Sequence, residues 1–128
     1  MGFHLDIKEI PCGLEQYDIM FLPHWRIEEL PVNSADLFLN TCSISEINMN
    51  AALHYLSIIK KTVRDGGYFY TYNVFHDDRR NEQRVDYGIE HLIKHSKFDL
   101  FKLVSSSKLD LLKLEKHKTM ILQKTNTD

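Results

Sequence analysis

The pattern of apolar and polar residues predicts a chain in which strands alternate with helices. The apolar runs at residues 17–22 and 35–40 are short and nearly continuous, which is typical of strands that are covered on both faces. Between them, the segment from Pro23 to Pro31 has room for one helical turn at most, and residues 32–34 form a turn. The chain therefore begins its regular structure with two strands.

The strongest local pattern predicts a helix over about residues 44–64. Its apolar residues recur at the period of one helix face: Ile47, Ala51, Ala52, Tyr55, Leu56, Ile59 and Val63. Ser43 and Glu46 match a capping box at its start, in which the two side chains bond to free amides of the first turn. Gly66 and Gly67 follow its end, where a glycine can adopt the left-handed cap.

The second half of the chain completes an α/β pattern. Strands and a short helix are expected at residues 68–74, 86–95 (the helix), 98–104 and 119–124. The early strands should be parallel, whereas the last two have no long helix between them and can pair antiparallel at an edge. Residues 1–128 are then a single domain, with a poorly defined segment at 1–16 and a frayed tail at 125–128.

Composition and charge exclude several classes of protein. A chain of 128 residues fits one domain with a real core. With 16 basic and 18 acidic side chains the net charge is −2, so the sequence has no basic field that would attract nucleic acid. It shows no signal peptide, and no apolar run reaches the roughly 20 residues of a membrane helix. Cys12 and Cys42 then indicate free thiols, so we expect a cytoplasmic protein without membrane or nucleic-acid partners.

Common catalytic motifs are missing from the sequence. None of the five glycines belongs to a glycine-rich phosphate or dinucleotide loop. His91 and His95 are four residues apart on the short predicted helix, but a third zinc ligand is not evident, so we expect no metal site. Ser43 and Ser45 lack the flanking glycines of a nucleophile elbow. The arginines of residues 79–84 could bind nucleic acid, but acidic neighbours neutralise them, so a solvated loop is favoured.

The polar residues that follow the parallel strands are the best candidates for a site. Ligands of open α/β sheets bind at the carboxyl ends of the strands. Asn40 and Asn73 end the two strands that the long helix joins, so they should be neighbours, and Glu46 or His76 could act there as a general base. The alternative is that both asparagines only tie down loops and that Trp25 packs against the sheet.

The run from Tyr17 to Asn73 resembles the sugar O-methyltransferases, which use S-adenosylmethionine and have the class I methyltransferase fold. The shared pattern is a strand that ends in Asn-Thr-x-Ser, a Glu soon after it, a helix, a Gly-Gly turn and an aromatic strand that ends in Asn. The matching residues are Phe21-Leu22-Pro23-His24-Trp25, Leu30-Pro31, residues 36–47, Tyr55-Leu56 and residues 65–73. The resemblance covers about half of the chain.

The resemblance implies roles for individual residues. Glu46 or His76 would remove the proton of the sugar hydroxyl, although Glu46 could instead serve only as the capping partner of the helix. Asn73 would border the sugar or glycan acceptor. The residues expected near S-adenosylmethionine are Pro23, His24 and Trp25 on the adenine side, and Asn40 and Ser43 beside the sulfonium.

One departure from the family changes what the chain can do alone. Such enzymes begin with a strand, a glycine-rich loop, a helix and a strand ending in an acid, for which residues 1–16 are too few. The resemblance thus implies a fragment, the carboxyl-terminal part of a Rossmann-like sheet, weak or inactive by itself. Strand 35–40 would have an open edge unless strand 17–22 moves in. The alternative function is a non-enzymatic interaction module that forms a homodimer, or pairs with a longer partner, through that edge.

Overall fold

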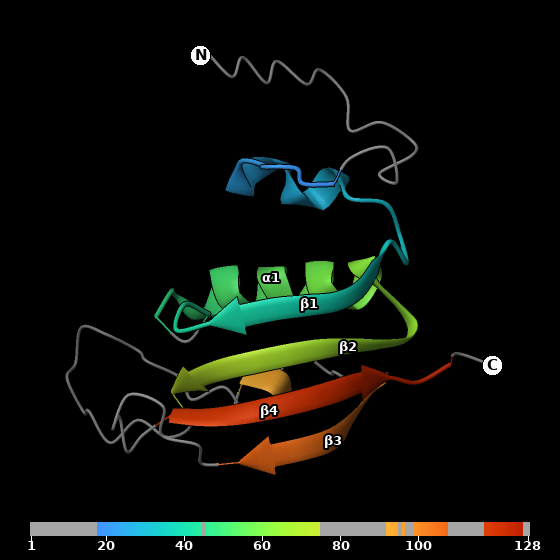
Figure 1. The fold of residues 1–128 in the computed structure, drawn as a ribbon. Coiled ribbons are helices and arrows are strands. Elements are labelled where there is room, and N and C mark those ends of the chain that lie inside the picture. The colour runs from blue at the N-terminus through green and yellow to red at the C-terminus, as the bar shows by residue number, and fades with distance from the viewer. Residues whose placement is uncertain are drawn as a thin grey trace.

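The structure, a computed structural model, has a mixed α/β fold (Figure 1). It describes residues 18–44, 46–74, 92–94, 96, 99–107 and 117–126. The elements are the 3-10 helix η2 (His24–Glu29), β1 (Ala35–Thr41), α1 (Met49–Thr62), β2 (Val63–Val74), β3 (Phe101–Ser107) and β4 (His117–Lys124). Residues 92–94 are helical, and the remainder of the short helix expected at 86–95, with His91 and His95, lies outside the described residues.

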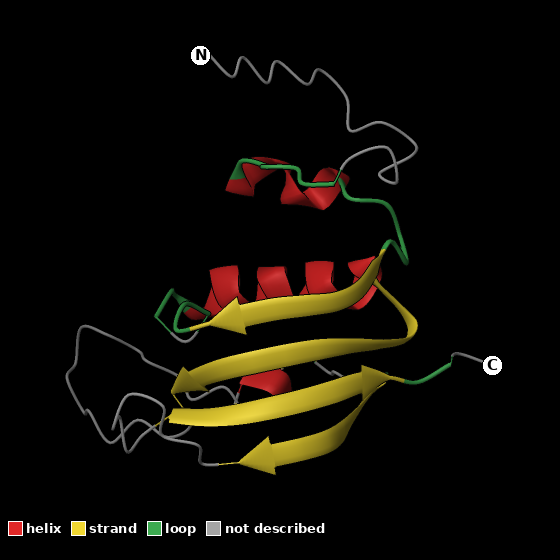
Figure 2. Cartoon of the chain, in the orientation of Figure 1, coloured by secondary structure: helices red, strands yellow, loops and turns green. Residues whose placement is uncertain are grey.

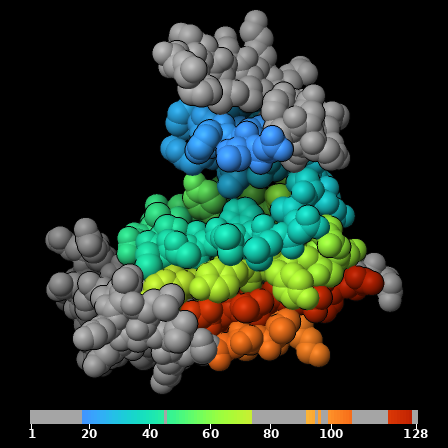
Figure 3. Space-filling model, viewed as in Figure 1, coloured from blue at the N-terminus to red at the C-terminus, as the bar shows by residue number. Residues whose placement is uncertain are grey.

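The four strands form one sheet in the order β1-β2-β4-β3. β1 and β2 are parallel, and both β2 with β4 and β3 with β4 are antiparallel. The predicted parallel start and antiparallel end are therefore confirmed. In Figure 2, α1 and the helical residues 92–94 both lie behind the sheet, and no described helix lies in front of it. Figure 3 shows the strands side by side on this front face.

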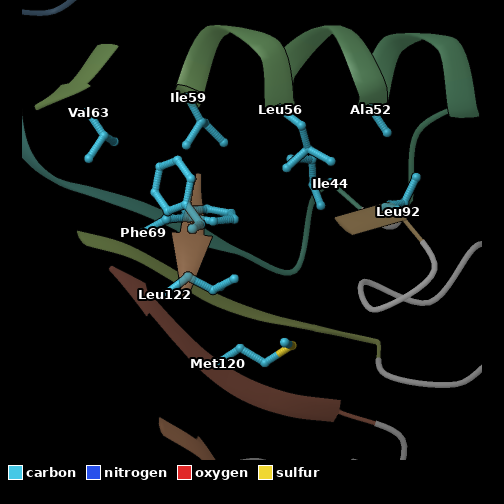
Figure 4. Packing of buried hydrophobic residues seen from close by; sticks show 10 residues of the cluster. Ile44, Ala52, Leu56, Ile59, Val63, Phe69, Leu92, Met120 and Leu122 are labelled. Atoms are coloured by element: carbon cyan, nitrogen blue, oxygen red, sulfur yellow. The ribbon is translucent and has the colours of Figure 1, made fainter. Parts of the chain in front are cut away.

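The hydrophobic core lies between α1 and the sheet (Figure 4). The inner face of α1 presents Ala52, Leu56 and Ile59, each 0% exposed. Phe69 from β2 is equally buried. Its ring packs edge to face against that of Phe38, with the two ring centroids 6.3 Å apart. Burying one large apolar side chain stabilises a fold by about 1.5–3 kcal/mol, so this layer holds α1 on the sheet and with it the loop that enters the helix.

The helix begins five residues later than the capping box predicted. α1 starts at Met49, and its cap is Asn48, whose side-chain oxygen accepts a hydrogen bond from the Ala51 amide at 2.9 Å. The Ser43 hydroxyl accepts a hydrogen bond from Asn40 instead of capping the helix. The capping role expected for Glu46 is therefore wrong, because Ser43 belongs to a network at the end of β1.

Removing the cap should weaken the helix measurably. The change Asn48→Ala is expected to lower the free energy of unfolding by about 1 kcal/mol, since the Ala51 amide loses its partner. Urea denaturation followed by circular dichroism measures the difference. Asn50→Ala is the matched control, because Asn50 is exposed within the same first turn and alanine favours the helix. Equal loss in both variants would contradict the capping role of Asn48.

The glycines after the helix serve β2 rather than a helix cap. α1 ends at Thr62, and Val63 is already extended with φ −66° and ψ 128°. Gly66 has a φ of 76°, which favours glycine. A Cβ on Gly67 would lie 2.9 Å from the carbonyl oxygens of Arg64 and Asp36, so glycine is needed for β1 and β2 to come this close. The pairing register of the two strands shifts at this point.

The strand predicted at residues 17–22 is wrong for its described part, residues 18–22, which have no regular structure. Ile19 and Phe21 are 76% and 78% exposed. The next segment forms η2, six residues long and thus longer than the single turn expected. Glu28 ties η2 to α1 through the His54 ring and the Lys61 ammonium. The segment is held at the helix and does not pair with the sheet, so β1 is an edge strand of the sheet that the structure describes.

Within η2, Arg26 and Glu29 form an ion pair at 2.6 Å. The hydrogen bond from the Arg26 guanidinium lowers the pKa of the Glu29 carboxyl. A carboxyl with a lowered pKa stabilises the fold above its ordinary pKa and loses this effect as the pH falls through the folded value. Because the pair is exposed, this contribution to stability is small.

Candidate functional site

β1 and β2 end side by side, and two asparagine side chains meet there. The Asn73 amide nitrogen donates a hydrogen bond to the Asn40 side-chain oxygen at 2.8 Å. The expectation that these residues are neighbours is thus confirmed. Their contact follows from the topology, because α1 connects two parallel strands and returns the chain to the same end of the sheet.

Asn73 is the buried centre of this network. Its side chain is 0% exposed. Besides Asn40, its amide nitrogen donates to the Thr71 hydroxyl at 2.6 Å, and its oxygen accepts a hydrogen bond from the Ser43 backbone amide at 3.1 Å. A buried amide with its polar atoms bonded to protein holds neighbouring backbone in place. Asn73 therefore fixes the loop that follows β1.

Asn40 holds the same loop from the other side. Its amide nitrogen donates to the Ser43 hydroxyl at 2.7 Å, and its oxygen also accepts from the Ile44 backbone amide at 3.4 Å. Within this loop Cys42 has a φ of 48°, and its backbone amide donates a hydrogen bond to the Tyr72 carbonyl at 2.7 Å. The asparagines thus tie down the loop, as the alternative interpretation proposed, and they leave Ser43 exposed at its surface.

A cavity of about 260 Å³ opens beside this loop. It is lined by Asn40, Ser43, Ile44, Ile47 and Tyr55, so two polar side chains stand against an apolar wall. Small-molecule sites usually measure about 300–1,000 Å³. The cavity is therefore too small to enclose a whole cofactor such as S-adenosylmethionine, and its residues could line only one side of it.

The other predicted site residues are more dispersed. Glu46 is exposed, and its backbone amide bonds to the Ser43 carbonyl in the turn before α1. Pro23 and His24 are exposed, and the Trp25 side chain is 72% exposed with its ring 5.1 Å from that of His24. The alternative that Trp25 packs against the sheet is therefore wrong. His76 and Ser45 lie outside the described residues.

Sequence reasoning missed several residues of the site. Thr71 is 0% exposed and bonds to Asn73, two positions on along the same face of β2. Ile44, Ile47 and Tyr55 form the apolar wall of the cavity. The signal for Thr71 was its spacing from Asn73, whereas the wall depends on how the loop folds back onto α1.

Neither a metal site nor a membrane-spanning helix is found in the part of the chain that the structure describes. No group of three or more His, Cys, Asp or Glu side chains there could hold a metal ion. Among its helices, none has the length and apolar character needed to cross a membrane.

Comparison with known proteins gives likenesses in structure alone. The sequence matches no known protein family and no curated protein. The Burkholderia thailandensis 1,6-didemethyltoxoflavin-N1-methyltransferase, solved with bound 1,6-didemethyltoxoflavin and S-adenosylhomocysteine, has a TM-score of 0.57 at 22% identity. The likeness covers 78% of this chain and 48% of the enzyme.

Two other solved structures are similar to the chain. The Thermus thermophilus 16S rRNA N2 G1207 methyltransferase, in complex with AdoMet and guanosine, has a TM-score of 0.51 at 15% identity over 78% of this chain and 23% of its own. The [4+2]-cyclase SpnF has a TM-score of 0.55 at 10% identity, over 77% of this chain and 53% of the cyclase. These likenesses show that the chain has a Rossmann-like methyltransferase fold, and that it spans about half or less of each of the three structures.

Proposed function

We propose that the chain is the carboxyl-terminal part of an S-adenosylmethionine-dependent sugar O-methyltransferase. The observation that carries the proposal is the Asn40–Ser43–Asn73 network beside a cavity at the carboxyl ends of β1 and β2, in a fold shared with methyltransferases. Open α/β sheets bind ligands at this end. The sugar acceptor rests on the resemblance of residues 36–47 and 65–73 to that family.

The cofactor would supply an electrophilic methyl group on its sulfonium. In the proposed site, Asn40 and the exposed Ser43 line the cofactor side, opposite the wall formed by Ile44, Ile47 and Tyr55. Pro23, His24 and Trp25 would approach the adenine from η2. Because the five glycines form no glycine-rich loop, we expect this chain alone to bind the cofactor weakly and to be inactive or feeble.

The acceptor would be activated by a general base. Glu46 is an exposed carboxylate in the turn after the network, and His76 follows β2 in the sequence. Either could accept the proton of a sugar hydroxyl that is held in line with the methyl group. Asn73 is buried, so in this proposal it borders the acceptor through the loop that it holds.

A second candidate function is an interaction module without catalysis. The observation in its favour is that no described strand pairs with the outer side of β1. The likeness to the cyclase SpnF also shows that this fold is shared by proteins named for different reactions, so fold alone does not decide the chemistry.

Amide chemical shifts measured by NMR during a titration with S-adenosylmethionine test the proposed enzyme site. We expect shifts for the amides of residues 40–44, with an affinity much weaker than micromolar. The variant Ser43→Ala should reduce them, whereas Ser57→Ala should not, because the Ser57 hydroxyl is exposed on α1 and bonds to His54. Shifts absent from residues 40–44 at saturation would contradict the site, and micromolar affinity by calorimetry would contradict the expected weak binding.

A further inference from the structure

In the part of the chain that the structure describes, no strand pairs with the outer edge of β1. β1 is the first strand of the sheet order, and Figure 1 shows it at the upper edge. Within the described ranges, no backbone hydrogen bond reaches this edge between residues 36 and 41. Leu37 and Leu39 are 50% and 62% exposed. An edge strand with free amides and exposed leucines is a template for strand addition.

The direction of the free backbone groups follows from the bonds to β2. The Cys42 amide donates to the Tyr72 carbonyl, and Thr41 is the register partner of Tyr72. In a parallel ladder this pattern directs the backbone groups of residues 40 and 42 toward β2. The backbone amide and carbonyl of Thr41 then point away from β2. Because the direction alternates along a strand, Leu37 and Leu39 also direct their amides and carbonyls outward.

We propose that β1 pairs antiparallel with β1 of a second copy of this chain, about a two-fold axis at Phe38. In this register Leu37 lies opposite Leu39 of the partner subunit, and each pair exchanges two backbone hydrogen bonds. The leucines of both copies then share the face opposite α1, where they bury apolar surface. The result is one continuous sheet across the two copies. This proposal rests on the second candidate function, the interaction module, and does not depend on cofactor binding.

Charge and composition favour this partner and register. Asp36 is the only charged residue of β1, and its carboxylate pairs with Arg64 of the same chain. In the proposed register it falls opposite Asn40 of the partner subunit rather than another carboxylate. Sliding the register by two residues would place Asp36 against the apolar Phe38 of the partner subunit or beyond the paired strand. β1 contains no lysine or proline, the residues that usually protect an edge strand.

Neither the other edge of the sheet nor η2 competes with this pairing. β3 carries an irregularity between Leu103 and Ser105, and its Lys102 is exposed, both of which disfavour strand addition. η2 is bonded through Glu28 to α1 and not to the outer edge of β1. Of the two edges of the described sheet, β1 is therefore the one that can accept a partner.

Sedimentation velocity of the full chain over a wide concentration range tests the proposal. The wild-type chain of 15.1 kDa should approach twice its mass as concentration rises. Leu39→Pro should abolish the dimer, since proline removes an outward amide without breaking the ladder with β2. Leu39→Lys, at the same exposed position, should also lose it, whereas Leu103→Lys on β3 should keep it.

Hydrogen exchange provides a readout that does not depend on how the variants fold. In the wild-type chain, the amides of Leu37 and Leu39 should become protected as concentration rises, while that of Lys102 should not. A monomer at every concentration would overturn the proposal. A dimer that survives both Leu39 variants with those amides unprotected would place the interface elsewhere and overturn it equally.

Discussion

Replacing Asn73 by leucine is expected to lower the free energy of unfolding by about 3 kcal/mol and to release the loop after β1. The Asn73 side chain is completely buried and bonds to Asn40, Thr71 and the Ser43 amide. Leucine has similar volume but no polar atoms, so these partners lose their bonds, and each unsatisfied buried group costs roughly 1–3 kcal/mol. Urea denaturation at constant m-value measures the loss.

A double-mutant cycle with Asn40→Ala separates the network from simple packing. Because the two asparagines bond to each other, their effects should be coupled by about 1 kcal/mol or more instead of adding. Asn50→Ala, in an exposed position on α1, is the control and should be close to neutral. A loss in Asn73→Leu no larger than in this control would show that the network does not hold the loop.

The fold could be predicted from sequence wherever local pattern and sheet topology agree. The strands around Leu37, Phe69 and Leu122 and the helix through Leu56 lie where the apolar runs and the helical period placed them. Residues 18–22 have an equally apolar run but no strand, because a strand needs a neighbour. Glu28 holds the following η2 at α1, and that contact between distant residues has no local signal.

The candidate site was predictable in part for the same reason. Asn40 and Asn73 could be paired from sequence, because a helix between parallel strands brings the two strand ends together. The start of the helix could not be predicted from sequence, because Ser43 had two possible partners, the helix amides and the Asn40 side chain. The second partner prevails because it belongs to a network anchored by the buried Asn73, and Asn48 then takes over the cap.

Replacing Lys124 by methionine is expected to destabilise the chain by about 3 kcal/mol, an effect comparable to that of Asn73→Leu. Lys124 is only 6% exposed. From β4, its ammonium donates to the carbonyls of Lys60 and Val63 at 2.9 and 2.7 Å and to the Asn33 side-chain oxygen at 3.1 Å. It thus joins the end of α1, the turn before β1 and the last strand, three segments distant in sequence.

The direction of the effect depends on what the substitution leaves behind. Replacing a buried charge by an apolar side chain can be neutral when its partner is removed too. Here the Asp65 carboxylate, 3.7 Å from the ammonium, stays in place. The Lys60 and Val63 carbonyls also stay at the end of α1, where helix carbonyls favour a cation. Lys102→Met on the exposed face of β3 is the matched control and should change the denaturation midpoint little. If both variants unfold at the same urea concentration as the wild-type chain, water can replace the ammonium and Lys124 does not hold the end of α1 to the sheet.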